Sequence, residues 1–202
     1  RELVATTNLG EGATYGVGMP IIMTFNEPIE NKADIEERLR VETDSEEPVV
    51  GSWNWEGDST VTYRPKKYWP ANTKVTVEAD IKGVHAGNDA YALDNKREKF
   101  KIGDEVILVQ DSAAHQMVVK ENGKTVRTLP TSTGKPGHET RSGTKVIMSK
   151  EQHVVMDAAT LGVSKDDPDY YRIDAYWSMR VTWSGEYIHS APWSVGSQGY
   201  AN

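Results

Sequence analysis

The chain has 202 residues, a length that suits one large domain or two small ones. Its content of 37% hydrophobic and 26% charged residues is typical of a folded protein, and its formal net charge is −7. The negative charge argues against a nucleic-acid partner, because no basic stripe is present to neutralise phosphates. No apolar run approaches the roughly 20 residues that a membrane-spanning helix needs.

Cysteine is absent, which excludes disulfides, thiolate metal sites and a thiol nucleophile within these residues. The five histidines show neither an HxxH nor an HExxH spacing. We therefore expect no metal site and no cofactor.

The first half of the chain contains short alternating segments separated by turns rich in Gly, Pro and Asn, which is typical of a β-sandwich. The predicted strands are Ile21–Phe25, Arg40–Thr43, Val49–Trp55, Thr60–Arg64, Lys74–Ala79 and Lys99–Ile102. A helix of one or two turns is expected at Ala33–Leu39. Because this half shows no cluster of catalytic residue types, a spacer or scaffold role is the better interpretation.

Aromatic residues gather in one stretch of the first half, at Trp53, Trp55, Tyr63, Tyr68 and Trp69. Such a stretch can bind a glycan or fill a core. Core packing is the stronger interpretation of the two.

A composition change near Gly103 predicts a boundary between units 1–103 and 104–202. The strands expected after it are Val106–Asp111, Gln116–Lys120, Lys124–Pro130, Lys145–Met148, His153–Met156, Ala175–Trp183 and Glu186–Ile188. The pair Asn122-Gly123 is the strongest short-range signal for a tight hairpin. The second unit is therefore also mainly β.

Three loops interrupt the second unit. Thr131–Gly143 is a long loop with three glycines, and Asp157–Tyr171 is a polar excursion that we expect to be mobile. Ser184-Gly185 is the turn between the last two predicted strands. Beyond it, His189 stands where a strand gives way to an irregular loop, which is a common location for a proton-transfer residue. By itself such a histidine is more simply interpreted as a packing or hydrogen-bonding residue.

Several ordered motifs extend through nearly the whole chain. They are Tyr15–Pro20, Tyr68–Pro70, Thr73–Val77, Val106–Asp111, Met117–Val119, Thr131–Pro136, Thr140–Thr144, Val155–Asp157, Tyr171-Arg172, Ser184-Gly185 and, most specific of all, His189–Trp193. Together they resemble the catalytic domain of L,D-transpeptidases (the YkuD family), preceded by the immunoglobulin-like domain of mycobacterial and related actinobacterial members. The resemblance implies a mainly β chain: an immunoglobulin-like β-sandwich at 1–103, then a YkuD-type domain at 104–202 whose C-terminal part is missing.

The resemblance also implies a reaction. Members form 3→3 cross-links between peptidoglycan stem peptides through a cysteine thioester with release of D-Ala, and carbapenems acylate the same cysteine. His189 matches the general base, and Ser190 matches the residue whose backbone carbonyl orients that base. The residues that match substrate-binding or loop-supporting positions are Met156, Tyr171, Ser184, Gly185 and Trp193. The Asp157–Tyr171 excursion would then be a lid over the donor site.

Spacing alone leaves simpler alternatives open for these residues. Met156 and Tyr171 also fit ordinary core packing, and Ser184-Gly185 also fits a plain hairpin turn. Lys135 and Arg141 are either solvated loop charges or partners of substrate carboxylates.

The family's nucleophile lies in a Ser-His-Gly-Cys motif a few residues after the segment matched by Gly199–Asn202. We expect that the sequence is truncated before this motif, in preference to a natural inactive fragment, and that the 202 residues alone are inert. The implied substrate exists only outside the cytoplasmic membrane, so an exported protein of the cell envelope is expected, with a signal ahead of Arg1.

The expected partners are peptidoglycan stem peptides and, as inhibitors, carbapenem β-lactams, and the expected state is a monomer. The alternative function is a non-catalytic cell-wall-binding or spacer protein of two β domains. The aromatic first half and the absent cysteine support that alternative. A cysteine encoded shortly after Asn202 would favour the enzyme.

Overall fold

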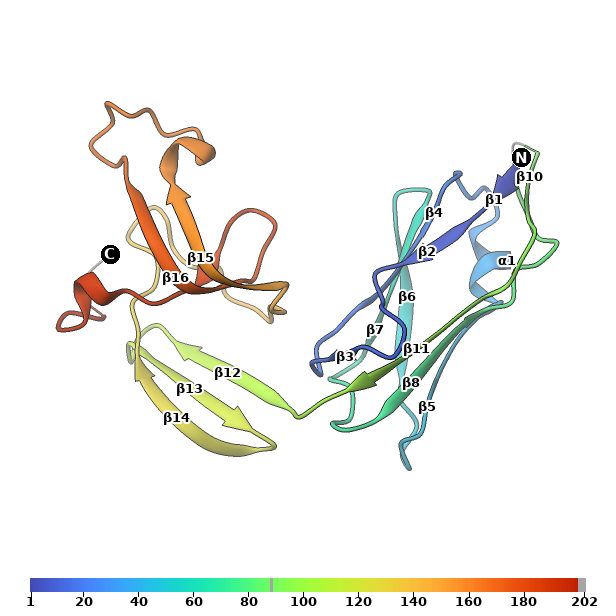
Figure 1. The fold of residues 1–202 in the computed structure, drawn as a ribbon, viewed down its shortest axis with the longest axis horizontal. Coiled ribbons are helices and arrows are strands. Elements are labelled where there is room, and N and C mark those ends of the chain that lie inside the picture. Colours follow the sequence, from blue (N-terminus) through green and yellow to red (C-terminus); the bar gives the residue numbers. More distant parts are fainter. Residues whose placement is uncertain (88, 200–202) are drawn as a thin grey trace. The chain divides into compact units, whose positions relative to one another are not determined.

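The computed structural model describes residues 1–87 and 89–199, and the chain forms two compact units (Figure 1). The first comprises Arg1–Ile107 with Lys120–Val126, and the second comprises Leu108–Val119 with the chain from Arg127 on. Both are built mainly from strands, which confirms the predicted fold class. The boundary expected at residues 103 and 104 stays a prediction. None of the helices among the described residues is long and apolar enough to cross a membrane.

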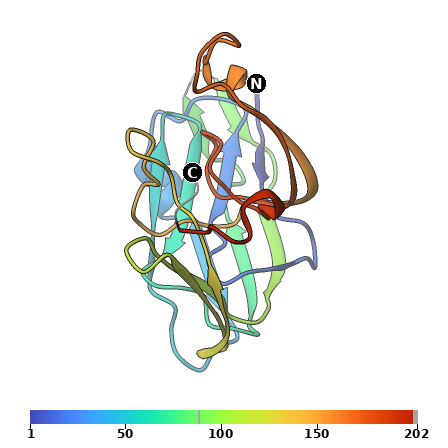
Figure 2. The same ribbon diagram turned by 90° about the vertical axis from the view of Figure 1, so that its left-hand side faces the viewer.

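The first unit is a sandwich of two four-stranded sheets, ordered β2-β4-β7-β6 and β3-β11-β8-β5, with a small β1-β10-β9 sheet at one end (Figures 1 and 2). Its strands are β1 (Glu2–Leu3), β2 (Ala5–Thr7), β3 (Thr14–Tyr15), β4 (Ile21–Phe25), β5 (Leu39–Thr43), β6 (Gly51–Glu56), β7 (Thr60–Pro65), β8 (Lys74–Ala79), β9 (His85–Gly87), β10 (Ala90–Ala92) and β11 (Lys96–Ile102). Alternate residues of β4 and β8 are buried, so each sheet turns one apolar face to a common core.

A chain of aromatic rings crosses this core from one sheet to the other. Trp53 contacts Tyr63 at a centroid distance of 5.2 Å, Tyr63 contacts Trp69 at 5.8 Å, and Trp69 contacts Phe100 at 6.1 Å. The indole N–H of Trp69, which is buried, donates to the carbonyl of Met19 at 2.7 Å. Core packing is therefore confirmed for most of the aromatic stretch, although Tyr68 is exposed.

The only α-helix among the described residues, α1 (Lys32–Glu36), ends earlier than the expected Ala33–Leu39. Asn31 caps its start by accepting from the backbone N–H of Asp34. Leu39 is instead the first residue of β5, where it pairs with Ala79 and is buried in the core. Local helix propensity predicts a helix that includes Leu39, but the burial of Leu39 in the β-sheet outweighs that propensity.

The strands β12 (Val106–Asp111), β13 (Gln116–Glu121) and β14 (Lys124–Pro130) form a three-stranded sheet. Asn122 and Gly123 both adopt positive φ angles, of 47° and 78°, which is the signature of the tight turn that the sequence predicts. Asn122 further accepts from the backbone N–H of Glu105 and donates to Asp104, both at 3.0 Å.

The second unit holds the antiparallel sheet β15-β16-β17, made of β15 (Ser149–Asp157), β16 (Arg172–Arg180) and β17 (Tyr187–Ile188). Two short 3₁₀ helices follow its strands, η1 (Ala158–Leu161) after β15 and η2 (Pro192–Ser194) after β17. The strand expected at Lys145–Met148 is wrong. Only Met148 reaches the sheet, through its N–H to the carbonyl of Arg180.

Candidate active site

His189 directly follows β17, a two-residue strand at the edge of the β15-β16-β17 sheet. Met179 and Arg180 of β16 pair with Ile188 and Tyr187, and this pairing fixes the backbone that leads into the histidine. Its Nδ1 lies 2.9 Å from the backbone carbonyl oxygen of Ser190. A carbonyl oxygen only accepts, so Nδ1 carries the proton and the lone pair of the neutral ring is on Nε2.

Ser190 is itself held by the neighbouring strand. Its N–H and its hydroxyl both donate to the carbonyl of Tyr176, at 3.1 and 2.9 Å. Next to Tyr176, Trp177 has a left-handed φ of 54°. The Tyr176 carbonyl of β16 thus positions Ser190, whose own carbonyl orients the imidazole.

Trp193 lies over the candidate base. Its ring stacks on the ring of His189 with centroids 6.0 Å apart and an angle of 29° between the planes. Pro192 begins η2 at a position where its missing N–H costs nothing, and this helix carries Trp193 back over the histidine. More than half of Trp193 remains exposed, so its other surface is available for contact.

Met156 and Tyr171 both lie near the paired ends of β15 and β16. Met156 pairs with Ile173, and the N–H of Ala158 donates to the carbonyl of Tyr171 at 2.9 Å. Tyr171 is 44% exposed and Met156 is partly buried, so neither is an ordinary core residue. Among the described residues, no hydrogen bond or ring contact joins either of them to His189.

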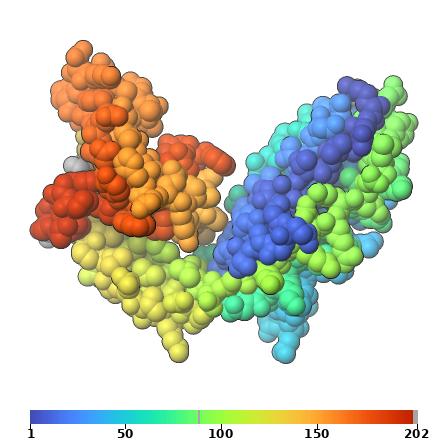
Figure 3. Space-filling view, in the orientation of Figure 1, coloured from blue at the N-terminus to red at the C-terminus, as the bar shows by residue number. Residues whose placement is uncertain are grey.

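The segment between these strands, residues 157–171, projects beyond the ends of β15 and β16 (orange in Figures 1, 2 and 3). Ala158 is buried, but the rest of the segment is exposed or partly exposed. Lys135, from the Thr131–Gly143 loop, donates to Asp169 of this segment at 2.5 Å and lowers the pKa of that carboxyl. The projecting segment is thus held to a second loop by a charged contact.

Ser184 and Gly185 belong to the turn between β16 and β17. The N–H of Gly185 donates to the carbonyl of Thr182, and Gly185 has a φ of 97° that favours glycine. A methyl group built on Gly185 would lie 3.9 Å from the side chain of Leu161 in η1, so the projecting segment comes close to this turn.

The turn is also bound to the Gly-rich loop through charged residues that the sequence did not single out as a group. Arg141 donates to the Ser184 hydroxyl and to Glu186, both at 2.8 Å. Lys145 donates to the other carboxylate oxygen of Glu186 at 3.0 Å. The sequence left Arg141 as either a solvated loop charge or a partner of substrate carboxylates, and no sequence signal linked it to Glu186, because their contact spans 45 residues.

The Gly-rich loop reaches the segment that follows the histidine as well. The hydroxyl of Ser132 accepts from the N–H of Gly199 at 2.8 Å. Inside the loop, a Cβ on Gly134 would overlap the carbonyl of His138, so this close turn requires glycine. The loop therefore contacts the projecting segment, the turn and the chain that follows His189.

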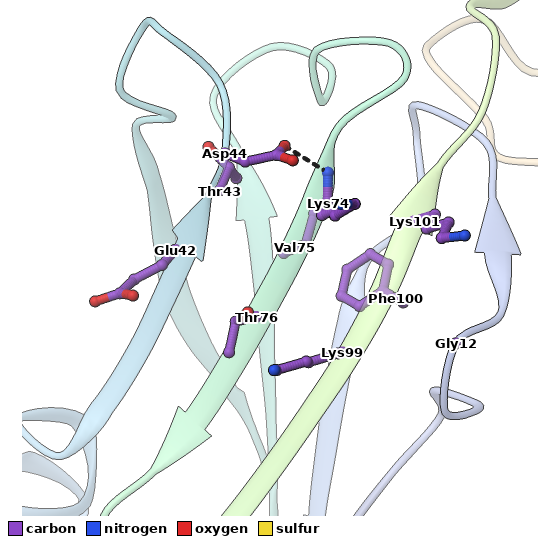
Figure 4. A pocket seen from close by; sticks show the side chains of 10 residues that line it. All are labelled: Gly12, Glu42, Thr43, Asp44, Lys74, Val75, Thr76, Lys99, Phe100 and Lys101. Carbon is purple, nitrogen blue, oxygen red and sulfur yellow. Dashed lines mark hydrogen bonds between the residues drawn. The ribbon is translucent and has the colours of Figure 1, made fainter.

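Across residues 1–87 and 89–199, no cluster of three or more His, Cys, Asp or Glu side chains could bind a metal. A hollow of about 430 Å³ lies in the first unit on the sheet formed by β3, β11, β8 and β5 (Figure 4). Lysines and carboxylates line it, together with Thr43 and Thr76, but no histidine does, so it lacks a base suited to acyl transfer.

Two family models match the chain. One, described as a bacterial Ig domain, covers residues 1–85, and the other, described as an L,D-transpeptidase catalytic domain, covers residues 104–201. L,D-transpeptidase 1 of Mycobacterium tuberculosis (strain H37Rv) is 38% identical over 199 residues, which are 98% of this chain and 73% of that protein. L,D-transpeptidase 2 of M. tuberculosis (strain CDC 1551) is 37% identical over 193 residues, 96% of this chain and 47% of that protein.

A solved structure agrees with these matches. The L,D-transpeptidase LdtMt1 in complex with imipenem has a TM-score of 0.81 to this chain at 38% identity, over 98% of this chain and 84% of that one. The chain therefore belongs to the L,D-transpeptidase family, with an immunoglobulin-like domain ahead of the catalytic domain. It spans about half the length of L,D-transpeptidase 2 and about three quarters of L,D-transpeptidase 1.

Proposed function

We propose that the protein is a peptidoglycan L,D-transpeptidase that forms 3→3 cross-links through a cysteine thioester, with His189 as the general base. One observation carries this proposal: the Nδ1 contact to the Ser190 carbonyl leaves Nε2 as the basic nitrogen, in a chain of this family. These residues contain no cysteine, so the thiol that the mechanism needs lies outside them.

In this mechanism Nε2 accepts the thiol proton, and the thiolate attacks the carbonyl between the third residue and the terminal D-Ala of a tetrapeptide stem. The imidazolium returns its proton to the departing D-Ala amine, and a thioester remains. An amine on the third residue of a neighbouring stem then attacks the thioester, which forms the cross-link and restores the thiol. A thiol is only slightly ionised near neutral pH, so a neighbouring base raises the reactive fraction.

The substrate-binding roles follow from the same proposal. Met156 and Tyr171 line the donor site, residues 157–171 form its lid, and Ser184-Gly185 holds substrate backbone. A lid favours attack by an amine over hydrolysis, because it excludes water from the thioester. The exposure of Tyr171 and the proximity of Leu161 to Gly185 support this assignment. Trp193 supports the histidine by stacking on it.

The proposed place of action is the cell envelope, outside the cytoplasmic membrane, where assembled peptidoglycan is found. Cell fractionation checks this point. Recovery of the native protein only from the cytoplasm would contradict the substrate assignment.

Intact mass spectrometry with a carbapenem tests the chemistry directly, because LdtMt1 is known in complex with imipenem. The full-length protein is expected to gain one adduct, and His189→Ala is expected to gain it about a hundredfold more slowly or slower still, as for loss of a general base. The 202 residues alone are expected to gain none.

Three results would count against the proposal. Acylation of the 202-residue chain would locate the nucleophile elsewhere, and an undiminished rate in His189→Ala would remove His189 from its role. Absence of any adduct on the full-length protein would favour the non-catalytic wall-binding alternative. As a control, Trp183→Ala changes an exposed aromatic residue in the same unit that contacts no candidate residue through its ring.

A further inference from the structure

Arg141 is anchored on one side by two acceptors. One terminal nitrogen, Nη2, donates both to Oε2 of Glu186 and to the hydroxyl of Ser184, at 2.8 Å each. Lys145 fixes the same carboxylate from the other side, because its Nζ donates to Oε1 of Glu186 and to the backbone carbonyl of Arg141. The guanidinium is therefore held in place at the Ser184-Gly185 turn.

The three charges of this cluster do not cancel. Hydrogen bonding from Arg141 is the main cause that lowers the pKa of Glu186 to about 2, and the same contact raises the pKa of Arg141. Glu186 is thus ionised near neutral pH, and Arg141 keeps its positive charge. Two positive charges face one negative charge, so the cluster keeps one net positive charge.

The free part of the guanidinium is accessible. The Arg141 side chain is 63% exposed, against 22% for Lys145 and 25% for Glu186. Among the residues that the structure describes, Nε and Nη1 of Arg141 have no hydrogen-bond partner. The free N–H groups of a planar guanidinium can donate two parallel hydrogen bonds to a carboxylate, and the net positive charge of the cluster attracts such an anion.

We propose that Arg141 binds a free carboxylate of the peptide substrate held at the Ser184-Gly185 turn, and so makes the enzyme select carboxylate over carboxamide at that position. This inference rests on the proposed function. Arg141 contacts Ser184 of the turn, and Leu161 of the lid lies close to Gly185, so a peptide at the turn has both a cation and an apolar side chain nearby. Arg141 was one of two loop charges in the sequence, and its anchoring beside the turn is what distinguishes it.

The test compares donor peptides that differ at a single carboxyl group. Three matched pairs carry either a free carboxylate or a carboxamide, at the second residue, at the third residue or at the C-terminus. The ratio of kcat/KM within each pair is measured for the full-length protein and for Arg141→Gln, Arg141→Lys and Arg127→Gln. Arg127 is an exposed arginine of β14 with no contact to the turn, so Arg127→Gln removes the same charge elsewhere.

In one of the three pairs, the unaltered protein is expected to favour the carboxylate about tenfold, the usual effect of one charge-assisted hydrogen bond. Arg141→Gln is expected to bring that ratio close to one, while Arg141→Lys, which keeps the charge without the planar donors, gives an intermediate ratio. Arg127→Gln keeps the full ratio. A purely structural role for Arg141 lowers both members of a pair equally and leaves the ratio unchanged.

Two results overturn the inference. One is an equal ratio in the unaltered protein and in Arg141→Gln for all three pairs, and the other is no preference for a carboxylate in any pair. Acylation by imipenem, measured in parallel, separates these failures from failure of the proposed function. A protein that imipenem acylates but that shows no Arg141-dependent ratio refutes only the role of Arg141, whereas absence of any acylation refutes both.

Discussion

The two units of this chain are stabilised in different ways. In the first, 21 buried apolar side chains among the described residues form one continuous cluster. In the second, the buried apolar residues among those described are Met117, Ala158 and Ala175, and large side chains such as Trp183 are exposed. The second unit is instead connected by backbone ladders and by charged contacts between loops, such as those of Arg141 and Lys135.

This difference matches the roles that we assign to the two units. Apolar burial is non-directional and stabilises a rigid sandwich, but it leaves few polar groups free for chemistry. Hydrogen bonds and ion pairs between loops contribute less per contact, yet they fix specific atoms in place, as in the contact of Arg141 with Glu186. Four measurements, ordered by expected effect, test whether the comparison holds.

The largest effect is expected from Trp69→Ala in the first unit. Trp69 contacts two other rings of the core and donates to Met19, so its removal is expected to cost about 3–5 kcal/mol. Urea unfolding followed by circular dichroism measures the change. Trp183→Ala is the matched control, because Trp183 is 84% exposed, and it is expected to change stability by less than about 0.5 kcal/mol. Equal losses in the two variants would contradict the contrast between the units.

A smaller effect is expected at the β13/β14 turn. Asn122 has a positive φ of 47°, which Asn tolerates better than Ala does. Asn122→Ala also removes the hydrogen bonds to Glu105 and Asp104. The free energy of unfolding is expected to fall by about 1–2 kcal/mol. Glu121→Ala, one residue earlier and exposed, serves as the control. If Asn122→Ala had no more effect than Glu121→Ala, the turn would not be a stabilising element.

The third measurement concerns acid stability of the second unit. The pKa of Glu186 is depressed from 4.5 to about 2, so the stabilisation it gives is fully present above pH 4.5 and is lost as the pH falls towards 2. Because the pair is partly exposed and screened by solvent, we expect about 1 kcal/mol. The stability difference between the unaltered chain and Glu186→Gln, measured by urea unfolding, should shrink across that pH window. A difference independent of pH would show that the ion pairs of Glu186 add nothing.

The smallest effect is expected at the contact between Lys135 and Asp169. Lys135→Gln removes an exposed ion pair that solvent screens, so total stability is expected to change very little. Hydrogen exchange in residues 166–170 is nevertheless expected to become severalfold faster, because this segment, the proposed lid, loses its charged contact to the Gly-rich loop. Lys165→Gln removes a lid charge that makes no such contact. Exchange as slow as in β15 and β16 in all three proteins would contradict the mobile lid.

The sequence predicted most strands of both units because their signal is local. Alternation of apolar residues in Ile21–Phe25 and Lys74–Ala79, and the Asn122-Gly123 turn, are properties of a few adjacent residues. The two clear errors, the long helix and the strand at Lys145–Met148, arose where distant residues decided the outcome. Leu39 pairs with Ala79 in a sheet, and Lys145 donates a hydrogen bond to Glu186.

For the site, the sequence by itself determined which residue types are present and, through ordered motifs, that they resemble one family. His189, Ser190 and the turn at Ser184-Gly185 could be named for that reason. Only the tertiary structure decided which nitrogen of His189 is basic, because that depends on a backbone carbonyl, and a carbonyl is common to every residue. The tertiary structure also showed that Arg141 and Lys145 both contact Glu186. The sequence could not predict these contacts, because nothing in the local sequence of a charged residue indicates which distant residue it will pair with.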